Sequence, residues 1–315
     1  MITFGPVPSR RLGRSLGINN IPYKICTYSC VYCQIGRTVN MTIKRRTFYD
    51  PMRILKDVKI RLEEVHKKGE RVDYVTFVPD GEPTLDINIG KTAALIGDWG
   101  TPVAIITNSS LLWREDVRQD LYNFDLVSLK LDAVSKDIWR RVNRPHRELS
   151  LERILDGILE FRKNYKGKLL TETMLIDGIN YEREIRKIAD FVRKLSPDRA
   201  YIAVPIRPPA ESWVRPATEY VVNYAFQELS KVLSSERVEL LISHEGTDFT
   251  SVGGDLESEL LSITSVHPIR EDSLKVLLNK AGADWSFVEK LISEGKLVKI
   301  VYNGKKFYMR SFRKK

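Results

Sequence analysis

The feature that most constrains this chain is a regular alternation of short β-branched runs with longer helical segments between about Tyr74 and Ser243. Segments that alternate in this way form successive βαβ units, whose strands pair in parallel. The predicted strands are Ser15–Ile18, Tyr74–Val78, Val103–Thr107, Leu126–Leu131, Leu169–Leu175, Tyr201–Pro205 and Val238–Ser243. The predicted helices, where apolar residues recur every three or four positions, are Pro51–Gly69, Trp113–Asn123, Leu151–Tyr165, Glu182–Leu195 and Glu219–Leu233. This pattern favours an α/β fold built on a partial (β/α)6 barrel of the TIM type, with a doubly wound open sheet as the alternative.

The pattern changes at residues 244–255, a polar stretch with three glycines that we expect to link two domains. Three short helical segments follow, at Leu256–Thr264, Arg270–Ala281 and Ser286–Glu294. Asn303-Gly304 then stands between two alternating apolar runs, which is a strong hairpin signal because both residues accept the positive φ of a type I′ turn. We therefore predict a barrel over residues 1–248 and a small winged helix-turn-helix domain over residues 249–315.

Charge and hydropathy narrow the classes of partner. The formal net charge is +10, which favours contact with a polyanion such as a nucleic acid. The chain shows neither the apolar core of a secretory signal nor a stretch long enough to span a bilayer. We expect a cytoplasmic protein with no membrane partner.

Only three cysteines occur, and all lie within eight residues: Cys26, Cys30 and Cys33. An odd, clustered set is a poor disulfide framework and a good shared ligand set for an inorganic group. Dense thiolates select an iron–sulfur cluster or zinc. A structural zinc needs four ligands, and the four histidines lie far away in the sequence, so zinc is the weaker alternative. A cubane held by three cysteines leaves one iron open to a small chelating molecule.

The CxxxCxxC spacing, with Tyr32 directly before the last cysteine, resembles the cluster-binding loop of the radical S-adenosylmethionine (SAM) superfamily. Further stretches resemble a branch of stand-alone iron–sulfur oxidoreductases grouped with tRNA wyosine synthases: GPVPSRRLGRSLGI, CTYSCVYCQIGRT, DGEPTL, VNRPH, RPPAE and ITSVHP. The resemblance implies a [4Fe–4S] cluster on the three cysteines and SAM chelated to the open iron. It also implies a low-potential electron donor such as ferredoxin or flavodoxin, and cleavage of SAM to a 5′-deoxyadenosyl radical.

The resemblance assigns SAM contacts to the ends of successive strands. The turn Asp80-Gly81-Glu82 is similar to the family's Gly-Gly-Glu turn, which receives the methionine ammonium, with Asp80 in place of the first glycine. A turn at the carboxyl end of a parallel strand offers oxygens to such a cation. The other implied contacts, including Lys130 where the family has a serine, are Tyr32, Thr107, Asn108, Ser128, Lys130, Asp132, Glu172, Thr173 and Val204.

Substrate candidates come from loops at the same end of the predicted barrel. Pro208 and Pro209 stiffen the loop that carries Arg207 and Glu211, so these side chains are suited to grip a phosphate or carboxylate. Further basic candidates are Arg10, Arg11, Arg14 and Arg144. The sequence assigns no catalytic residue.

The end of the chain interleaves lysines and arginines with aromatic residues, which favours RNA binding by the predicted winged helix. The resulting hypothesis is a radical SAM enzyme that modifies RNA, with a tRNA base as the expected target. One alternative is a radical SAM enzyme acting on a protein, peptide or small metabolite. Another is a DNA-binding regulator that senses redox state through an iron–sulfur cluster.

Overall fold

The fold is known from a computed structural model, which describes residues 2–242 and 255–311. Its largest element is a curled eight-stranded sheet in the order β1-β2-β5-β6-β7-β8-β9-β10. The bounds are β1 (Thr3–Ser9), β2 (Gly13–Ile18), β5 (Tyr74–Phe77), β6 (Val103–Thr107), β7 (Leu126–Lys130), β8 (Lys168–Met174), β9 (Arg199–Ala203) and β10 (Val238–Leu241). Strands β2 to β10 are parallel neighbours, and β1 pairs antiparallel with β2. This curled α/β half-barrel agrees with the predicted fold class.

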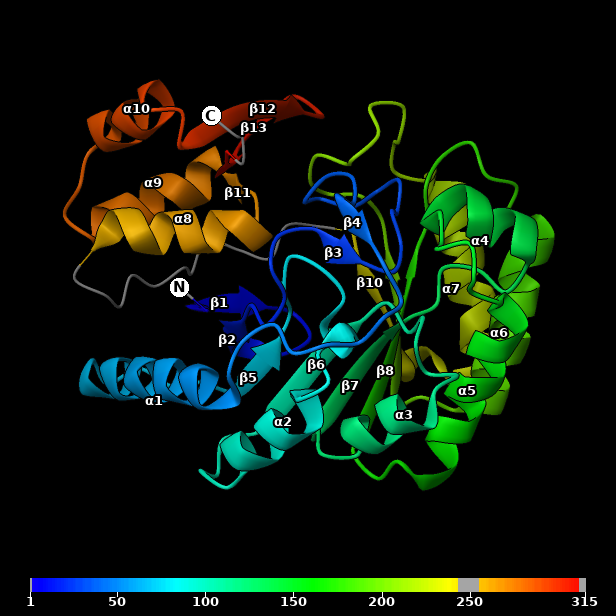
Figure 1. The fold of residues 1–315 in the computed structure, drawn as a ribbon. Helices are drawn as coiled ribbons and strands as arrows, with labels where there is room; N and C mark the ends of the chain where they lie inside the picture. Colours follow the sequence, from blue (N-terminus) through cyan, green and yellow to red (C-terminus); the bar gives the residue numbers. More distant parts are fainter. Residues whose placement is uncertain (1, 243–254, 312–315) are drawn as a thin grey trace.

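Helices connect the parallel strands and lie along the outer face of the sheet (Figure 1). They are α1 (Pro51–Lys67), α2 (Ile89–Gly97), α3 (Glu115–Leu121), α4 (Lys136–Asn143), α5 (Leu151–Asn164), α6 (Glu182–Leu195) and α7 (Glu219–Leu233). Local chemistry sets the start of α1: Asp50 caps it by accepting the amide of Met52 at 2.9 Å, and Pro51 occupies the first turn, where its missing N–H costs nothing.

The predicted strands of the eight-stranded sheet and the predicted helices on its outer face are confirmed, but one strand of this sheet and two of these helices were not predicted. Strand β1 was not predicted because Gly5, Pro6 and Pro8 read as strand breakers, yet an edge strand tolerates proline. Helices α2 and α4, of nine and eight residues, were not predicted either, and no side chain caps the start of either. Without β1, which is antiparallel, the described sheet has seven parallel strands, one more than a (β/α)6 barrel.

The C-terminal unit consists of α8 (Leu256–Val266), β11 (Ile269–Arg270), α9 (Glu271–Lys280), α10 (Trp285–Ser293), β12 (Leu297–Tyr302) and β13 (Lys305–Arg310). Its sheet has the order β11-β13-β12. Asn303 and Gly304 join β12 to β13 with φ of 48° and 70°, as the hairpin signal predicts. The predicted linker, apart from its last residue Asp255, and the boundary at 248/249 lie outside the described residues.

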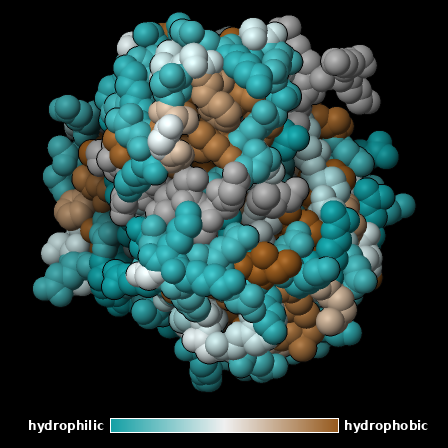
Figure 2. Space-filling view, turned by 90° about the vertical axis from the view of Figure 1, so that its left-hand side faces the viewer, coloured by the Kyte–Doolittle hydropathy of each residue, from teal (hydrophilic) through white to brown (hydrophobic). Residues whose placement is uncertain are grey.

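The C-terminal unit packs directly on the half-barrel. Phe4 of β1 lies in its hydrophobic core, and Tyr302 donates a hydrogen bond to the Pro205 carbonyl at 3.0 Å. Arg61 of α1 forms a buried ion pair with Glu259 of α8. Figure 2 shows the face on the left of Figure 1, which is mostly hydrophilic and carries small separate hydrophobic patches. Among the described helices, none is both long and apolar enough to cross a bilayer.

Candidate functional site

The three cysteines lie on a loop that begins at β3 (Ile25–Cys26), which pairs with β4 (Asn40–Met41). The backbone of this loop is pinned from two sides. The amide of Val31 donates to the Val142 carbonyl at 2.9 Å, and the Val31 carbonyl accepts the amide of Glu211 at 3.0 Å. The loop is therefore held by the last turn of α4 and by the segment after β9, which are far away in the sequence.

Each cysteine sulfur faces a nitrogen donor from a different segment. The pairs are Lys24 Nζ with Cys33 Sγ at 3.2 Å, Asn143 Nδ2 with Cys30 Sγ at 3.4 Å, and Asn108 Nδ2 with Cys26 Sγ at 3.5 Å. N–H groups aimed at sulfur stabilise thiolate over thiol. This donor arrangement fits a cluster whose sulfur ligands carry negative charge.

Burial opposes the thiolate form when no metal is bound. It raises the pKa of Cys26 to about 11, and it also raises the pKa of Cys30. A bound iron ion would supply the positive charge that favours the thiolate. Among residues 2–242 and 255–311, no group of three or more Cys, His, Asp or Glu side chains is gathered closely enough for one metal ion. A cubane is held differently, since each thiolate binds its own iron.

Gly81 places the turn after β5 directly against the cysteine loop. A Cβ at this position would lie 1.9 Å from the Ile25 carbonyl oxygen, so the two backbones meet where no side chain fits. The Glu82 amide donates to the same Ile25 carbonyl at 3.1 Å, and the Lys24 amide donates to the Asp80 carbonyl at 3.1 Å. The turn and the cysteine loop thus form one packed unit.

Glu82 is buried and its carboxylate is fully engaged. It accepts hydrogen bonds from the Thr107 hydroxyl at 2.6 Å and from the backbone N–H of Asn108 at 2.8 Å. It also accepts from the backbone N–H and the hydroxyl of Thr84, at 3.1 and 2.6 Å. Burial raises its pKa. Glu82 therefore positions Thr107 and Asn108, and Asn108 in turn contacts Cys26.

Asp80, in contrast, keeps an oxygen available. Its Oδ2 accepts from Asn19 at 3.0 Å, while its buried Oδ1 has no hydrogen-bond partner within the described residues. Burial raises the pKa of Asp80 to about 7. A buried carboxylate oxygen without a donor is suited to receive a cation such as an ammonium group.

Tyr32, Asp132 and Asn143 link the cysteine loop to β7. Asp132 accepts hydrogen bonds from the Tyr32 hydroxyl and from Asn143 Nδ2, the latter at 2.7 Å, and Asn143 also contacts Cys30. Lys130 lies over the Tyr32 ring, with Nζ 5.1 Å from the centroid. The predicted SAM contacts Tyr32, Lys130 and Asp132 therefore lie together beside the cysteine loop.

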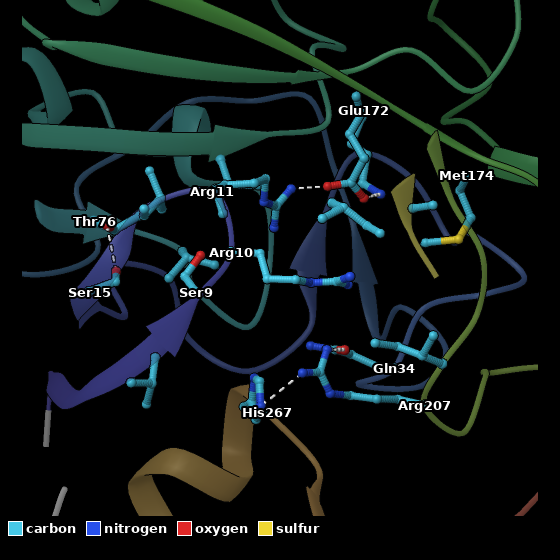
Figure 3. Close-up of a pocket in the computed structure, with 18 of the residues that line it drawn as sticks. Ser9, Arg10, Arg11, Ser15, Gln34, Thr76, Glu172, Met174, Arg207 and His267 are labelled. Atoms are coloured by element: carbon cyan, nitrogen blue, oxygen red, sulfur yellow. Dashed lines mark hydrogen bonds and ion pairs between the residues drawn. The ribbon is translucent and has the colours of Figure 1, made fainter. Parts of the chain in front are cut away.

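A cavity of about 300 Å³ lies inside the half-barrel, next to Cys33 and Tyr32 (Figure 3). Glu172 of β8 forms ion pairs with Arg11 and Lys130 across this cavity. Arg207, after β9, contacts Gln34 at 3.1 Å and His267 of the C-terminal unit at 2.8 Å. Burial lowers the pKa of Lys130.

The predicted site residues divide into three groups. Those that line the cavity are Tyr32, Cys33, Lys130, Glu172, Val204 and Arg207. Those that pack under or beside the cysteine loop are Cys26, Cys30, Gly81, Glu82, Thr107, Asn108 and Asp132. The remaining residues, Ser128, Thr173, Arg144 and Glu211, do not line the cavity. Ser128 Oγ is buried without a partner in the described residues, and Thr173 donates to the Leu131 carbonyl at 2.8 Å.

Arg144 and Glu211 meet outside the cavity. Glu211 accepts two hydrogen bonds from Arg37, at 2.8 Å each, and forms an ion pair with Arg144. Since Arg37 closely follows Cys33, these ion pairs hold the cysteine loop against the segments around residues 144 and 211. The neighbouring arginines lower the pKa of Glu211, mainly through the Arg37 hydrogen bonds.

Sequence reasoning did not identify Lys24 or the sulfur contact of Asn143. Lys24 lies two residues before Cys26 and is almost completely buried, which is unusual for lysine. No spacing rule marks either residue, because both contacts depend on the folded path of the loop.

Comparison with known proteins agrees with this geometry. Residues 20–192 match the model of the radical SAM superfamily. The chain is 50% identical over 313 residues to the UPF0026 protein MJ1312 of Methanocaldococcus jannaschii, covering 99% of this chain and 97% of that protein.

Solved structures share the fold at low identity. A structure of TYW1 with a lysine-pyruvate adduct bound matches with a TM-score of 0.53 and 18% identity, over 70% of this chain and 74% of that one. Streptococcus suis SuiB bound to S-adenosylmethionine matches with a TM-score of 0.52 and 14% identity, over 71% of this chain and 49% of that one.

The family assignment carries a [4Fe–4S] cluster and SAM as cofactors and an enzymatic role, and the cysteine loop, its sulfur donors and the Asp80 oxygen fit them. With the superfamily match spanning more than half of its length and the site geometry in agreement, this chain belongs to the radical SAM superfamily.

Proposed function

We propose that this enzyme reductively cleaves SAM to a 5′-deoxyadenosyl radical and uses it to modify RNA, with a tRNA base as the substrate. The observation that carries the radical chemistry is the cysteine loop, where each of three sulfurs faces a nitrogen donor and Cys33 lines the cavity inside the half-barrel. When bound, the cluster supplies the electron that breaks a carbon–sulfur bond of SAM.

The residues of this chain have distinct tasks in the proposed reaction. Lys24, Asn108 and Asn143 hold the sulfurs and favour their charged form. Asp80 Oδ1 receives the methionine ammonium, while Glu82 orients the turn that carries Asn108. The half-barrel and the C-terminal unit limit the access of water to the cavity, which protects a radical from side reactions.

The RNA substrate is supported by charge and by the C-terminal unit. We take this unit, residues 249–315, as a winged helix-turn-helix domain, because the order α8-β11-α9-α10-β12-β13 with a closing hairpin suits that architecture. Lys299 and Lys305 on its hairpin are exposed and make no ion pair within the described residues. By comparison, Lys296 and Lys306 pair with glutamates.

A protein, peptide or small metabolite is the second candidate substrate. SuiB bound to its precursor peptide SuiA also shares the fold, with a TM-score of 0.53 and 16% identity over 72% of this chain and 48% of that one. The family assignment favours an enzyme over the redox-sensing DNA-binding regulator. A ferredoxin or flavodoxin remains the proposed electron donor.

Binding of tRNA to the reconstituted enzyme at several salt concentrations tests the RNA proposal. Replacing both Lys299 and Lys305 by Ala is expected to weaken binding and to reduce the slope of log affinity against log salt by about 1.5. Replacing the exposed Lys166 and Lys194 on the half-barrel is the matched control and is expected to leave the slope unchanged.

Two results decide the matter. Mass spectrometry of tRNA nucleosides from a deletion strain should show one modified nucleoside missing. An unchanged nucleoside profile together with salt-independent binding to a protein would favour the second candidate.

A further inference from the structure

We propose that a surface groove between β4 and the end of α4 is the docking site of the electron donor, and that this donor is a small acidic electron-carrier protein. This inference rests on the radical SAM chemistry proposed above but not on the RNA substrate. It is carried by the position of the groove, by its charge and by the apolar side chains exposed beside it.

The groove lies against the outside of the cysteine loop. It has a volume of about 540 Å³, and two of its lining residues belong to the loop or to the strand paired with it. Ser29 directly precedes Cys30, and Met41 of β4 pairs with Cys26 of β3. A partner seated in the groove would therefore be next to two of the three sulfur ligands.

Other walls of the groove are hydrogen-bonded to the cysteine loop. The amide of His146, which lines the groove, donates to the Thr27 carbonyl at 2.9 Å. Trp139, also a lining residue, is buried and donates through its indole nitrogen to the Tyr28 hydroxyl at 3.0 Å. The groove is thus a preformed surface of the same packed unit that holds the cluster ligands.

The groove and the cavity inside the half-barrel are separate. Tyr32 and Cys33 line the cavity, Ser29 and Met41 line the groove, and none of the described residues lines both. A protein in the groove would leave the cavity to SAM and the substrate. An RNA held in the groove would not bring a base into the cavity, so the position favours an electron carrier over the substrate.

The groove is basic. Its charged lining residues are the exposed arginines Arg140, Arg144 and Arg147, and no Asp or Glu of the described chain lines it. Arg147 makes no ion pair within residues 2–242 and 255–311, and Arg144 shares the single carboxylate of Glu211 with Arg37. Over residues 136–149, which include all three lining arginines, five basic residues stand against two acidic ones. This excess attracts a protein of negative charge and speeds its association.

Exposed apolar side chains lie beside these arginines. Val39 is 74% exposed, and Met41, two positions later, is 36% exposed. A small apolar centre with charged residues around it is typical of a specific protein interface, and transient redox complexes bury little surface. The combination fits a small carrier with an acidic rim better than a free anion, which would gain nothing from Val39.

The electron balance of the proposed encounter is simple. The reduced carrier gives up one electron and leaves oxidised, and the bound cluster receives that electron. When SAM takes it up, one sulfur–carbon bond breaks to give methionine and the 5′-deoxyadenosyl radical. The carrier is the one co-reactant required.

Calorimetric titration of the reconstituted full-length enzyme with purified flavodoxin of net negative charge tests the docking site. The wild type should bind flavodoxin at low salt and more weakly at high salt, because salt screens exposed charges. A basic cytochrome c should not bind. The double variant Arg140→Glu with Arg147→Glu should weaken flavodoxin binding about tenfold or more, since two exposed attractions become repulsions.

The matched control is Lys166→Glu with Lys194→Glu, which changes the net charge equally. Both lysines are exposed and precede the amino ends of β8 and β9, whereas the cysteine loop lies at the carboxyl ends of the strands. This control should bind flavodoxin nearly as the wild type does. Urea unfolding shows whether each variant folds, and Arg140→Gln with Arg147→Gln provides a milder second variant with an intermediate loss.

A comparison of two reductants gives an independent readout. Dithionite is a small ion that needs no docking surface, so the arginine variants should form 5′-deoxyadenosine from SAM with dithionite as fast as the wild type. With limiting reduced flavodoxin, the same variants should form it about tenfold more slowly at low salt, in line with their weaker binding. An equal loss with both reductants would assign the arginines to the fold or to SAM and refute the inference.

The remaining outcomes are equally decisive. Flavodoxin binding that is the same in the arginine variants and the control, or no flavodoxin binding by the wild type, overturns the inference. Weaker tRNA binding by the arginine variants with unchanged flavodoxin binding would assign the groove to RNA and overturn it too. The proposed function is judged by dithionite alone: a wild type that binds flavodoxin in the groove but forms no 5′-deoxyadenosine with dithionite refutes the radical chemistry instead.

Discussion

Replacing Gly81 by Ala is expected to separate the turn after β5 from the cysteine loop. The new Cβ would begin 1.9 Å from the Ile25 carbonyl oxygen and must reach at least 3.0 Å, a displacement of about 1.1 Å. The obstacle is a backbone atom, which cannot rotate away as a side chain can. Overpacking of this kind costs about 3 kcal/mol. It also strains the hydrogen bond from the Glu82 amide to Ile25.

Two measurements check this expectation: urea unfolding, and the iron content per chain after anaerobic reconstitution. Gly81→Ala should unfold at lower urea and retain clearly less iron than the wild type. The matched control is Gly97→Ala at the end of α2, where an added Cβ meets no atom within 4 Å. This control should be neutral or slightly stabilising, because Ala favours helix over Gly. Wild-type stability and iron content in Gly81→Ala would refute the close packing of turn and loop.

Three further perturbations have expected outcomes. Asp80 loses its proton near pH 3.8 in the unfolded chain and near pH 7 in the folded, metal-free protein. Between these pH values the folded protein therefore binds more protons than the unfolded chain. Its stability should fall as pH rises through this window, by at most about 4 kcal/mol, and urea unfolding of Asp80→Asn should show a weaker pH dependence. Glu211→Gln should speed the loss of iron in air, measured by absorbance, because it weakens the ion pairs with Arg37 and Arg144 that hold the cysteine loop. Arg61→Met should lower the free energy of unfolding by about 3–5 kcal/mol because it removes the buried cation that pairs with Glu259, and adding Glu259→Gln should restore part of it.

The barrel could be predicted from sequence because its strands are short β-branched runs separated by segments of helical period. Strand β1 escaped prediction because its prolines are compatible only with an edge, and edge position is a tertiary property. The hairpin at Asn303 and Gly304 was predictable because its turn depends on two adjacent residues.

The candidate site was predictable where function depends on local spacing, as for Cys26, Cys30 and Cys33. Pairings between distant segments were not. Glu211 was predicted to face substrate, yet its carboxylate is held by arginines 174 and 67 residues away. Charge and loop position alone do not show whether such a side chain faces a ligand or another part of the chain.

The most direct measurement is the product of SAM after anaerobic reconstitution of the protein with iron and sulfide and reduction by dithionite. The wild type is expected to form 5′-deoxyadenosine and methionine in equal amounts, and Cys30→Ala is expected to form neither. A protein that binds zinc in place of the cluster, or a Cys30→Ala variant that makes 5′-deoxyadenosine as fast as the wild type, would contradict radical SAM chemistry at this loop.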